Sequence, residues 1–352
     1  MEKMNCAVLG ATGVVGQNFL RLLQEHPYFE LKSVCASDSR IGEKLGYVRE
    51  LIPGGIPPVF APLEFDPMRM DILKKKDIRV VFSALPADIA VNVEMEAAKR
   101  GMAVFSNAGA YRMDPQIPIL IPEINADHLD LVKQQQKKYP GFIITNANCT
   151  TTGLALSLLP LAGFNIEELI VSSYQAISGS GYPGHSALDM LNNVIPYIKN
   201  EEPKMRQECL KIFGNIRENS IELKEWNVYA HCIRVPTEIG HLISVHVKLK
   251  ESVEPQSVEA LFRNFSAPAI VRDLPTAPSK PVLFTEDPLR PQPRLDLGAG
   301  TPERAKGMAV VVGRLNVENN IIRFVTLSNN LIRGAAGGSV LNAELAYREK
   351  RL

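Results

Sequence analysis

The sequence has no apolar run that approaches the roughly 18 residues needed for a membrane-spanning helix. It also has no surplus of either charge: its 352 residues carry a formal net charge of +1, so neither a basic nucleic-acid-binding surface nor an acidic tail is indicated. The N-terminus leads directly into a strand-like run, without the apolar core of a secretory signal. We therefore expect a cytoplasmic protein that binds neither nucleic acid nor membrane.

Cysteine is scarce and widely spaced. There are five cysteines, an odd number, and no two of them form a CxxC pair. This pattern disfavours a disulfide framework or a zinc site and is typical of a protein in the reducing cytosol. The sequence also lacks an HExxH motif or another cluster of histidines and carboxylates, so we expect no metal. The length is sufficient for two domains.

Cys149 differs from the other cysteines because it lies in a polar, hydroxyl-rich turn, residues 145–153. A β-rich apolar run, residues 142–144, precedes this turn, and a helix-like run, residues 154–161, follows it. The N-terminus of a helix offers unpaired N–H groups and partial positive charge, both of which favour a thiolate. Cys149 is therefore a candidate nucleophile. The alternative, a buried structural cysteine, fits the polar turn less well.

A glycine turn near the N-terminus has the sequence context of a dinucleotide site. Residues 5–9 predict a buried strand, the GxxGxxG turn of residues 10–16 follows, and residues 17–24 have helical spacing. Glycines allow the backbone to approach a pyrophosphate, whose charge the helix N-terminus stabilises. The spacing is a looser variant of the usual GxGxxG pattern. The cofactor contacts that we predict in this turn are Gly10, Thr12, Gly13, Val14 and Val15.

The second predicted strand, residues 30–35, ends in a polar turn that bears on the choice between NAD and NADP. An NAD site expects a carboxylate there to bind the ribose 2′-hydroxyl. Here Ser37, Ser39 and Arg40 could hold a 2′-phosphate, which favours NADP. Asp38 would repel that phosphate if it pointed inward, so we expect its side chain to be turned to solvent.

Three further residues in the first half are predicted to face the cofactor crevice or an anion. Ser83 and Leu85 follow a compact buried strand, residues 78–82, at the end where a parallel sheet meets its cofactor. Arg112 lies in a loop after another strand at the same edge and is a candidate anion clamp. The alternative for Arg112 is an ordinary surface arginine.

Strands and helices alternate through the first half, which predicts a parallel, doubly wound sheet of the α/β class. Beyond residue 165 the pattern changes, and we predict strands at 168–176, 228–233, 241–249, 307–313 and 321–327. A glycine-rich loop at 177–184 can bring backbone N–H groups or a cofactor ring close to the nucleophile. The helices that we expect include 89–99, 129–138 and 187–199, and the segments that we expect to be irregular are 45–70 and 275–305.

A base for Cys149 is sought among six histidines. His241 follows Gly240 at a loop–strand junction, whereas His231 and His246 lie inside predicted strands and are better explained as structural. A neutral imidazole beside a thiol activates it for attack and transfers protons near neutral pH. We therefore predict that His241 is the acid–base partner.

Five motifs resemble, in order and over essentially the full length, those of the aspartate-semialdehyde dehydrogenase family. They are the glycine turn at 10–16, Asn-Cys-Thr at 148–150, Ser-Gly-Ser-Gly-Tyr-Pro-Gly at 178–184, Arg-Val-Pro to Gly-His at 234–241, and Ile-Arg-Gly-Ala-Ala-Gly at 332–337. The runs at 274–278 and 290–294 are most similar to the archaeal and fungal branch.

The resemblance implies two domains and an activity. A Rossmann-type NADP domain would span residues 1–148, completed by a C-terminal helix at 331–352, and an α+β catalytic and dimerisation domain would span 149–330. The implied enzyme, a homodimer or homotetramer, reversibly converts L-4-aspartyl phosphate to L-aspartate 4-semialdehyde and phosphate with NADPH. This reaction serves the biosynthesis of lysine, threonine, methionine and isoleucine.

Roles for individual residues follow from the same resemblance. Cys149 is the acyl-accepting nucleophile and His241 the acid–base group. The implied substrate contacts are Gln175, which orients the substrate, Arg234 for its carboxylate, Glu201 for its amino group, Arg112 and Lys204 for phosphate, and Asn148 in the nucleophile turn. The implied cofactor contacts in the second half are Ser178, Gly179, Gly181 and Asn330, the last at the nicotinamide carboxamide. Without the resemblance, the spacing of Glu201 and Lys204 predicts only a solvated salt bridge.

Two alternatives remain open. Malonyl-CoA reductases belong to the same branch, and Asn148 favours the aspartyl enzyme because the nucleophile turn of those reductases usually lacks this asparagine. The second alternative is a catalytically silent, nucleotide-sensing relative. The intact set of Cys149, His241 and Arg234 argues against it.

Overall fold

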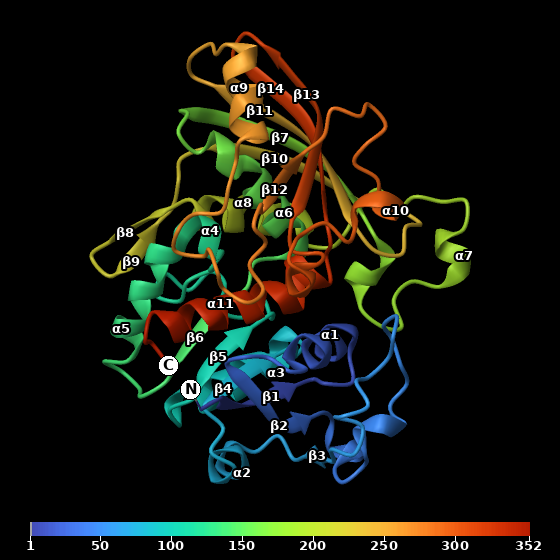
Figure 1. The fold of residues 1–352 in the computed structure, drawn as a ribbon, viewed down its shortest axis with the longest axis vertical. Coiled ribbons are helices and arrows are strands. Elements are labelled where there is room, and N and C mark those ends of the chain that lie inside the picture. Colours follow the sequence, from blue (N-terminus) through green and yellow to red (C-terminus); the bar gives the residue numbers. More distant parts are fainter. Residues whose placement is uncertain (1) are drawn as a thin grey trace. The chain divides into compact units, whose positions relative to one another are not determined.

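The computed structural model describes residues 2–352, which divide into two compact units (Figure 1). The first unit contains the described residues up to Ala147, together with Ile216–Glu222 and Ala335–Leu352. The second contains Asn148–Asn215 and Leu223–Gly334. The hairpin of β8 (Asn215–Arg217) and β9 (Ser220–Glu222) therefore lies mostly in the first unit, although the sequence placed it in the second domain.

The first unit is built on a six-stranded parallel sheet with the order β3-β2-β1-β4-β5-β6. Its strands are β1 (Met4–Leu9), β2 (Phe29–Cys35), β3 (Phe65–Asp66), β4 (Val80–Ser83), β5 (Ala103–Ser106) and β6 (Phe142–Thr145). The central strands are short, apolar and almost fully buried, as expected when helices cover both faces. The order reverses between β1 and β4, so their paired ends Leu9 and Ser83 mark the switch point where such sheets bind ligands.

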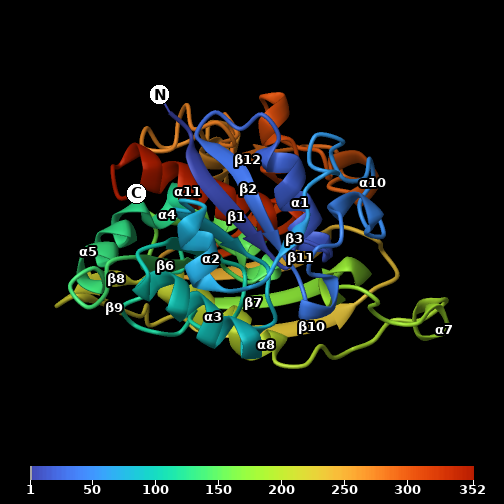
Figure 2. The ribbon, with the colours of Figure 1, turned by 90° about the horizontal axis from the view of Figure 1, so that it is seen from below.

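Helices cover this sheet on both faces (Figure 2). They are α1 (Val14–Leu23), α2 (Met70–Lys75), α3 (Ala87–Lys99), α4 (Pro122–Asn125), α5 (Val132–Gln135) and the C-terminal α11 (Gly337–Arg348). The buried side chain of Glu344 on α11 lies 2.9 Å from His26 Nε2, and Tyr347 stacks on Tyr28. The Nδ1 atom of His26 accepts two backbone N–H groups, so its ring proton lies on Nε2 and is donated to Glu344. These contacts anchor the end of the chain to the first unit.

The second unit contains a mixed six-stranded sheet with the order β10-β7-β11-β14-β13-β12. Its strands are β7 (Ile166–Gln175), β10 (Asn227–Arg234), β11 (His241–Leu249), β12 (Val282–Phe284), β13 (Val310–Glu318) and β14 (Ile321–Ser328). Its helices are α6 (Cys149–Leu158), α7 (Ala187–Met190), α8 (Glu201–Ile212), α9 (Pro255–Arg263) and α10 (Pro293–Asp296). Side chains alternate along β7, so Leu169 and Val171 are buried while Ile170 and Tyr174 face solvent on the outer face of the sheet.

Four expectations about local structure are wrong. The segment 45–70, expected to be irregular, contains β3 and a 3₁₀ turn, Leu45–Tyr47. The helix predicted at 187–199 is only the single turn of α7, because Asn192 adopts a left-handed conformation (φ +54°) and Pro196 lacks an N–H to continue the ladder. The helix predicted at 129–138 is a 3₁₀ segment, Ala126–Leu131, followed by the short α5. The segment 275–305, expected to be irregular, contains β12 and α10. In the described part of the chain, no helix combines the length and the apolar character that crossing a membrane requires.

Candidate functional site

Helix α6 begins at Cys149 because the preceding residue caps it. The Oδ1 atom of Asn148 accepts the N–H groups of Thr150 at 2.9 Å and Thr151 at 3.2 Å. Cys149 therefore occupies the first helical position, where the partial positive charge of the helix N-terminus stabilises a thiolate. The sequence predicted unpaired N–H groups at this helix N-terminus. In the structure the Asn148 side chain accepts two of them, those of Thr150 and Thr151.

The second unit brings Cys149 and His241 together. Cys149 Sγ lies 3.2 Å from His241 Nε2, although 92 positions separate the residues in the chain. His241 Nδ1 accepts the N–H of Ala176 at 3.1 Å. A neutral imidazole that accepts at Nδ1 carries its proton on Nε2, which here points to sulfur. The geometry therefore favours a thiolate that receives a hydrogen bond from His241, rather than a thiol that donates one to it.

The electrostatic surroundings keep His241 neutral. Burial lowers the pKa of His241 to about 3; the charge of Arg234 acts in the same direction, and the backbone of Gly240 partly opposes both. Burial also raises the pKa of Cys35 and Cys209 to about 12 and that of Cys232 to about 11. Cys149 is the one cysteine of the five that is not fully buried. A thiol reagent should therefore select Cys149.

Arg234 presents a buried cation beside this pair. Its Nη1 donates to the Ala176 carbonyl at 2.7 Å, while its buried Nε has no partner among the described residues. A buried guanidinium with an unused donor is arranged to receive an anion such as a carboxylate.

A polar cluster surrounds the carboxylate of Glu201 at the start of α8. Asn148 Nδ2 donates to both carboxylate oxygens, at 3.1 and 3.0 Å, and Lys204 Nζ lies 3.3 Å from Oε1. Gln175 Nε2 lies 3.5 Å from Oε2. The structure thus brings together four residues that the resemblance assigns to the substrate, and the salt bridge between Glu201 and Lys204 is only partly exposed.

The loop Ile177–Ser180 lies directly against His241 and Arg234. A Cβ added at Gly179 would lie 2.9 Å from Arg234 Nη1 and 3.2 Å from His241 Nε2, so a side chain here would press on both groups. Asn330 fixes the loop, because its Nδ2 donates to Ser178 Oγ at 3.0 Å and its Oδ1 accepts the N–H of Gly240 at 2.8 Å. Gly181 follows in a left-handed conformation, with φ of +72°.

Sequence reasoning missed two residues that contact the nucleophile turn. Glu208 is buried, and its Oε2 accepts the N–H of Asn148 at 2.6 Å. Glu208 follows Glu201 by seven residues, which places both side chains on the same face of one helix. This spacing was the available signal in the sequence. Gly334 lies in a π-helical turn, Ile332–Ala336, and a Cβ added there would come 2.7 Å from Cys149 Cβ. The sequence motif at 332–337 includes Gly334, but it did not indicate that this glycine contacts Cys149.

The first unit contains a turn that fits a pyrophosphate. Gly10 adopts a left-handed conformation, and a Cβ on it would lie 2.7 Å from the Ala84 carbonyl oxygen. Gly13 is the N-cap of α1, without a side-chain cap and with no acidic residue in the first turn. The start of this helix is therefore open to an anion. Thr12, Val14 and Val15 lie in the same turn and first helical residues.

The polar residues after β2 lie at the surface of the first unit. Ser37 Oγ lies 3.0 Å from Ser39 Oγ, and Arg40 Nη1 donates to Glu43 at 2.8 Å. Asp38 is exposed, as expected from the sequence. These hydroxyls and the guanidinium fit a phosphate, which would compete with Glu43 for Arg40. Ser83 ends β4 at the switch point, with Leu85 buried two residues later.

Arg112 is not an ordinary surface arginine, because it is buried in the first unit. Its Nε donates to the Asn146 carbonyl at 2.9 Å, and its Nη2 donates to the Asn107 carbonyl at 2.8 Å. These bonds fix the guanidinium to the backbone after β5 and β6. Within residues 2–352, there is no group of three or more His, Cys, Asp or Glu side chains that could hold a metal ion.

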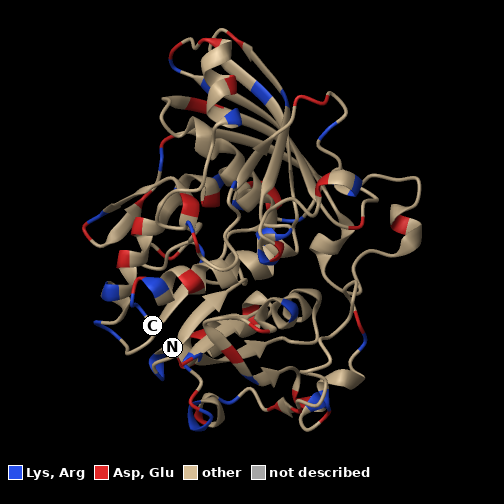
Figure 3. Ribbon diagram, in the orientation of Figure 1, with Lys and Arg blue, Asp and Glu red and all other residues tan. Residues whose placement is uncertain are grey.

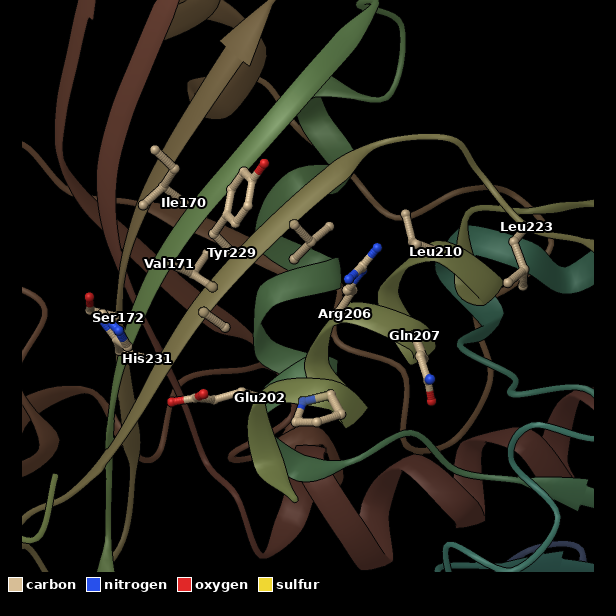
Figure 4. Close-up of a pocket in the computed structure, with 13 residues that line it drawn as sticks. Ile170, Val171, Ser172, Glu202, Arg206, Gln207, Leu210, Leu223, Tyr229 and His231 are labelled. Carbon is tan, nitrogen blue, oxygen red and sulfur yellow. The ribbon is translucent and has the colours of Figure 1, made fainter. Parts of the chain in front are cut away.

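A separate groove of about 820 Å³ lies between α8 and the edge strand β10 in the second unit (Figure 4). Tyr229 and Ile170 line it from the sheet, and Arg206 and Gln207 line it from the helix. Neither Cys149 nor His241 is among its lining residues, so this groove is not the reactive site.

Replacing Gly334 with alanine should displace Cys149, because the new methyl group would overlap its side chain and backbone. We expect alkylation of Cys149 by iodoacetamide to slow at least about tenfold, since small displacements of reacting groups have large effects on rate. Gly163→Ala is the matched control, because nothing lies within 4 Å of its added Cβ. An unchanged alkylation rate in Gly334→Ala, with an unchanged circular dichroism spectrum, would contradict the prediction. It would show that another part of the chain moves to accommodate the methyl group and that Cys149 does not.

Protonation of His241 should destabilise the fold in acid. The folded-state pKa, about 3, lies below the ordinary value of 6.5, so the unfolded chain takes up the proton first as the pH falls. The stability contributed by neutral His241 is therefore complete above pH 6.5 and is lost towards pH 3, at about 1.4 kcal/mol per pH unit. Urea unfolding measures the free energy of unfolding at pH 7 and at pH 5. The decrease in this free energy between the two pH values should be smaller for His241→Gln than for the parent, by roughly 2 kcal/mol. The exposed His231→Gln is the control, and equal losses in all three proteins would contradict the prediction.

Comparison with known proteins places these two units in one family. Residues 5–132 match the family described as semialdehyde dehydrogenase, NAD binding domain, and residues 158–333 match semialdehyde dehydrogenase, dimerisation domain. An aspartate-semialdehyde dehydrogenase from Archaeoglobus fulgidus is 43% identical over 99% of both chains. A malonyl CoA reductase (NADP) from Metallosphaera sedula is 36% identical, also over 99% of both chains.

A solved structure extends the comparison to the fold. The crystal structure of aspartate-semialdehyde dehydrogenase with NADP from Candida albicans matches with a TM-score of 0.89 and 33% identity, over 99% of this chain and 100% of that chain. The predicted fold class, a Rossmann-type parallel sheet domain with an α+β second domain, is confirmed. The resemblance seen in the sequence motifs is confirmed as well, and the chain belongs to the aspartate-semialdehyde dehydrogenase family.

Proposed function

We propose that this chain catalyses the reversible, NADP-dependent reductive dephosphorylation of L-4-aspartyl phosphate to L-aspartate 4-semialdehyde. The observation that carries the proposal is the 3.2 Å contact between Cys149 Sγ and His241 Nε2 at the N-terminus of α6, in a chain of this family. The protein is an oxidoreductase of amino-acid biosynthesis. We propose that it serves the routes to lysine, threonine, methionine and isoleucine.

The chemistry follows from the two side chains. The Cys149 thiolate attacks the acyl carbon of the substrate, a C–S bond forms, the C–O bond to phosphate breaks, and the products of this step are a thioester and phosphate. Bound NADPH supplies the hydride that reduces the thioester. His241 Nε2–H donates a hydrogen bond to the sulfur before attack. After hydride transfer, Nε2 gives its proton to the hemithioacetal oxygen while Nδ1 takes up a proton from solvent in place of the Ala176 N–H, so the ring stays neutral; in the reverse direction the same transfers run backwards.

We propose individual substrate contacts within each unit. In the second unit Arg234, with its unused Nε, holds the substrate carboxylate, and Glu201 holds its ammonium. Gln175 orients the substrate and Lys204 binds phosphate. Arg112 in the first unit is the other proposed phosphate ligand. Asn148 acts by positioning Glu201, because its amide nitrogen is directed at that carboxylate.

We propose that the first unit is the NADP domain, with the catalytic and dimerisation domain in the second. Gly10, Gly13 and the first turn of α1 suit the pyrophosphate, and the turn after β2 suits the 2′-phosphate. The Candida albicans relative was solved with NADP. The other proposed contacts to the cofactor are Thr12, Val14, Val15, Ser83, Leu85, Ser178, Gly179, Gly181 and Asn330. Asn330 would contact the nicotinamide while holding Ser178 and Gly240.

We propose a homodimer or homotetramer that assembles through the second unit. Ile170, Tyr174 and Tyr229 are large apolar side chains exposed on the outer face of its sheet. The match to a dimerisation domain covers all of them. A reducing, cytoplasmic compartment fits the thiolate chemistry and the five free cysteines.

The acyl donor is decided by one pair of assays. With L-aspartate 4-semialdehyde, phosphate and NADP, we expect NADPH formation; with malonyl-CoA and NADPH, we expect at most a trace of oxidation. Faster turnover of malonyl-CoA would favour the function of the Metallosphaera sedula relative. Cys149→Ser should lower kcat by about 10³-fold or more, because the thioester route is lost. Substantial residual turnover in this variant would refute that route.

Arg40 should determine the preference for NADP. Arg40→Ala removes a charge-assisted contact to the 2′-phosphate, so we expect the KM for NADP to rise about tenfold, equivalent to about 1.4 kcal/mol. The KM for NAD, which lacks this phosphate, should stay within about twofold. Arg49→Ala is the control, since Arg49 lies outside the turn after β2. An equal rise for both cofactors would show that Arg40 does not read the phosphate.

A further inference from the structure

An arm of the second unit, residues 181–198, exposes an unusual amount of apolar surface. It leaves the sheet after β7 and the loop Ile177–Ser180, contains α7, and returns at the start of α8 (Figure 1). Leu188 is 88% exposed, and the other large apolar side chains exposed along the arm are Tyr182, Leu191, Val194 and Tyr197. Exposed apolar groups gathered in one segment mark a surface that binds a partner.

The arm has almost no charge. Asp189 is its one Asp, Glu, Lys or Arg residue, and Figure 3 shows the ribbon around α7 almost entirely in the colour of uncharged residues. A solvent-facing surface normally carries about 25–35% charged residues. The arm also lacks the Lys and Arg residues with which amphipathic segments bind membrane surfaces. Its composition is therefore that of a buried protein–protein contact.

Both ends of the arm are attached to groups of the reactive site. Ile195 and Arg234 exchange two backbone hydrogen bonds, N–H to O at 3.0 Å and 2.8 Å. At the other end Gly181 donates its N–H to Ser178 at 3.2 Å, next to Gly179, which packs against His241 and the Arg234 guanidinium. The position of the arm is therefore linked to the backbone of Arg234 and to the loop Ile177–Ser180.

We propose that the arm is a contact between two copies of this chain and that its docking holds Arg234 and the loop Ile177–Ser180 in place. The proposal rests on the assembly and the activity proposed above. The dimerisation-domain match spans the whole arm. The arm also continues from β7 and returns beside β10, the strands whose outer face exposes Ile170 and Tyr229. A second copy offers the same uncharged surface, which suits a symmetric contact.

The test replaces two exposed leucines of the arm with aspartate. Leu188→Asp/Leu191→Asp places charges in the contact without touching the core, because both side chains are exposed. Val59→Asp, at an exposed apolar position of the first unit, is the matched control. We expect the mass from sedimentation equilibrium to fall to half or less in the arm variant and to stay unchanged in the control.

The arm variant should also raise the KM for L-aspartate 4-semialdehyde about fivefold or more. Fivefold is about the smallest change in affinity that is typical when one site is coupled to another. A fall in mass with unchanged KM would overturn the link to Arg234 and the loop. An unchanged mass would overturn the contact between copies, and a raised KM in that case would identify the arm as a lid over its own site.

A third variant distinguishes the proposed arm contact from the homo-oligomer proposed above to assemble through the second unit. Tyr229→Asp places a charge on the outer face of the sheet. If this variant dissociates while the arm variant does not, assembly through the second unit stands and the arm proposal fails. A parent enzyme that is active as a monomer would overturn the arm contact and leave the proposed activity intact.

Discussion

The geometry of the reactive cysteine depends on the side chain of Asn148. Its oxygen caps α6 and its amide nitrogen binds Glu201, while its backbone N–H is held by Glu208. A cap of this kind contributes only about 1 kcal/mol to stability. Its larger effect is positional, because it determines that the helix starts at Cys149. The nucleophile, the helix N-terminus and the carboxylate of α8 are therefore aligned by one residue.

One buried cation has two effects on the reactive pair. The charge of Arg234 helps burial to lower the pKa of His241, and the same charge stabilises a nearby thiolate. The lowered pKa and the hydrogen-bond geometry of His241 therefore favour a neutral imidazole beside the sulfur. This arrangement leaves a buried Arg234 Nε without a partner in the described part of the chain, which costs about 1–3 kcal/mol of stability. Such a cost is typical of a site that is completed by its substrate.

The parts of this fold that depend on local sequence were predictable. The strand, glycine turn and helix at the N-terminus, and the alternation along β11, follow from periodicity and turn residues. The approach of His241 to Cys149 could not be predicted from periodicity, because it depends on the pairing of β7 with β11 and on the packing of α6. The same limit applies to Gly334 and Glu208, whose roles exist only through contacts made in the folded chain.

Asn148 also explains how a residue outside direct contact can bias the choice of acyl donor. Its amide is directed at the helix cap and at Glu201, so in the proposed function it would favour an aspartyl donor by keeping that carboxylate in position. An aspartyl substrate carries an ammonium group that a carboxylate attracts, whereas malonyl-CoA carries a carboxylate and phosphates that it repels. In the proposed function, the discriminating charge is therefore that of Glu201. Loss of the Asn148 side chain would free this carboxylate to turn towards Lys204, which lies 3.3 Å away, and would thereby weaken the discrimination.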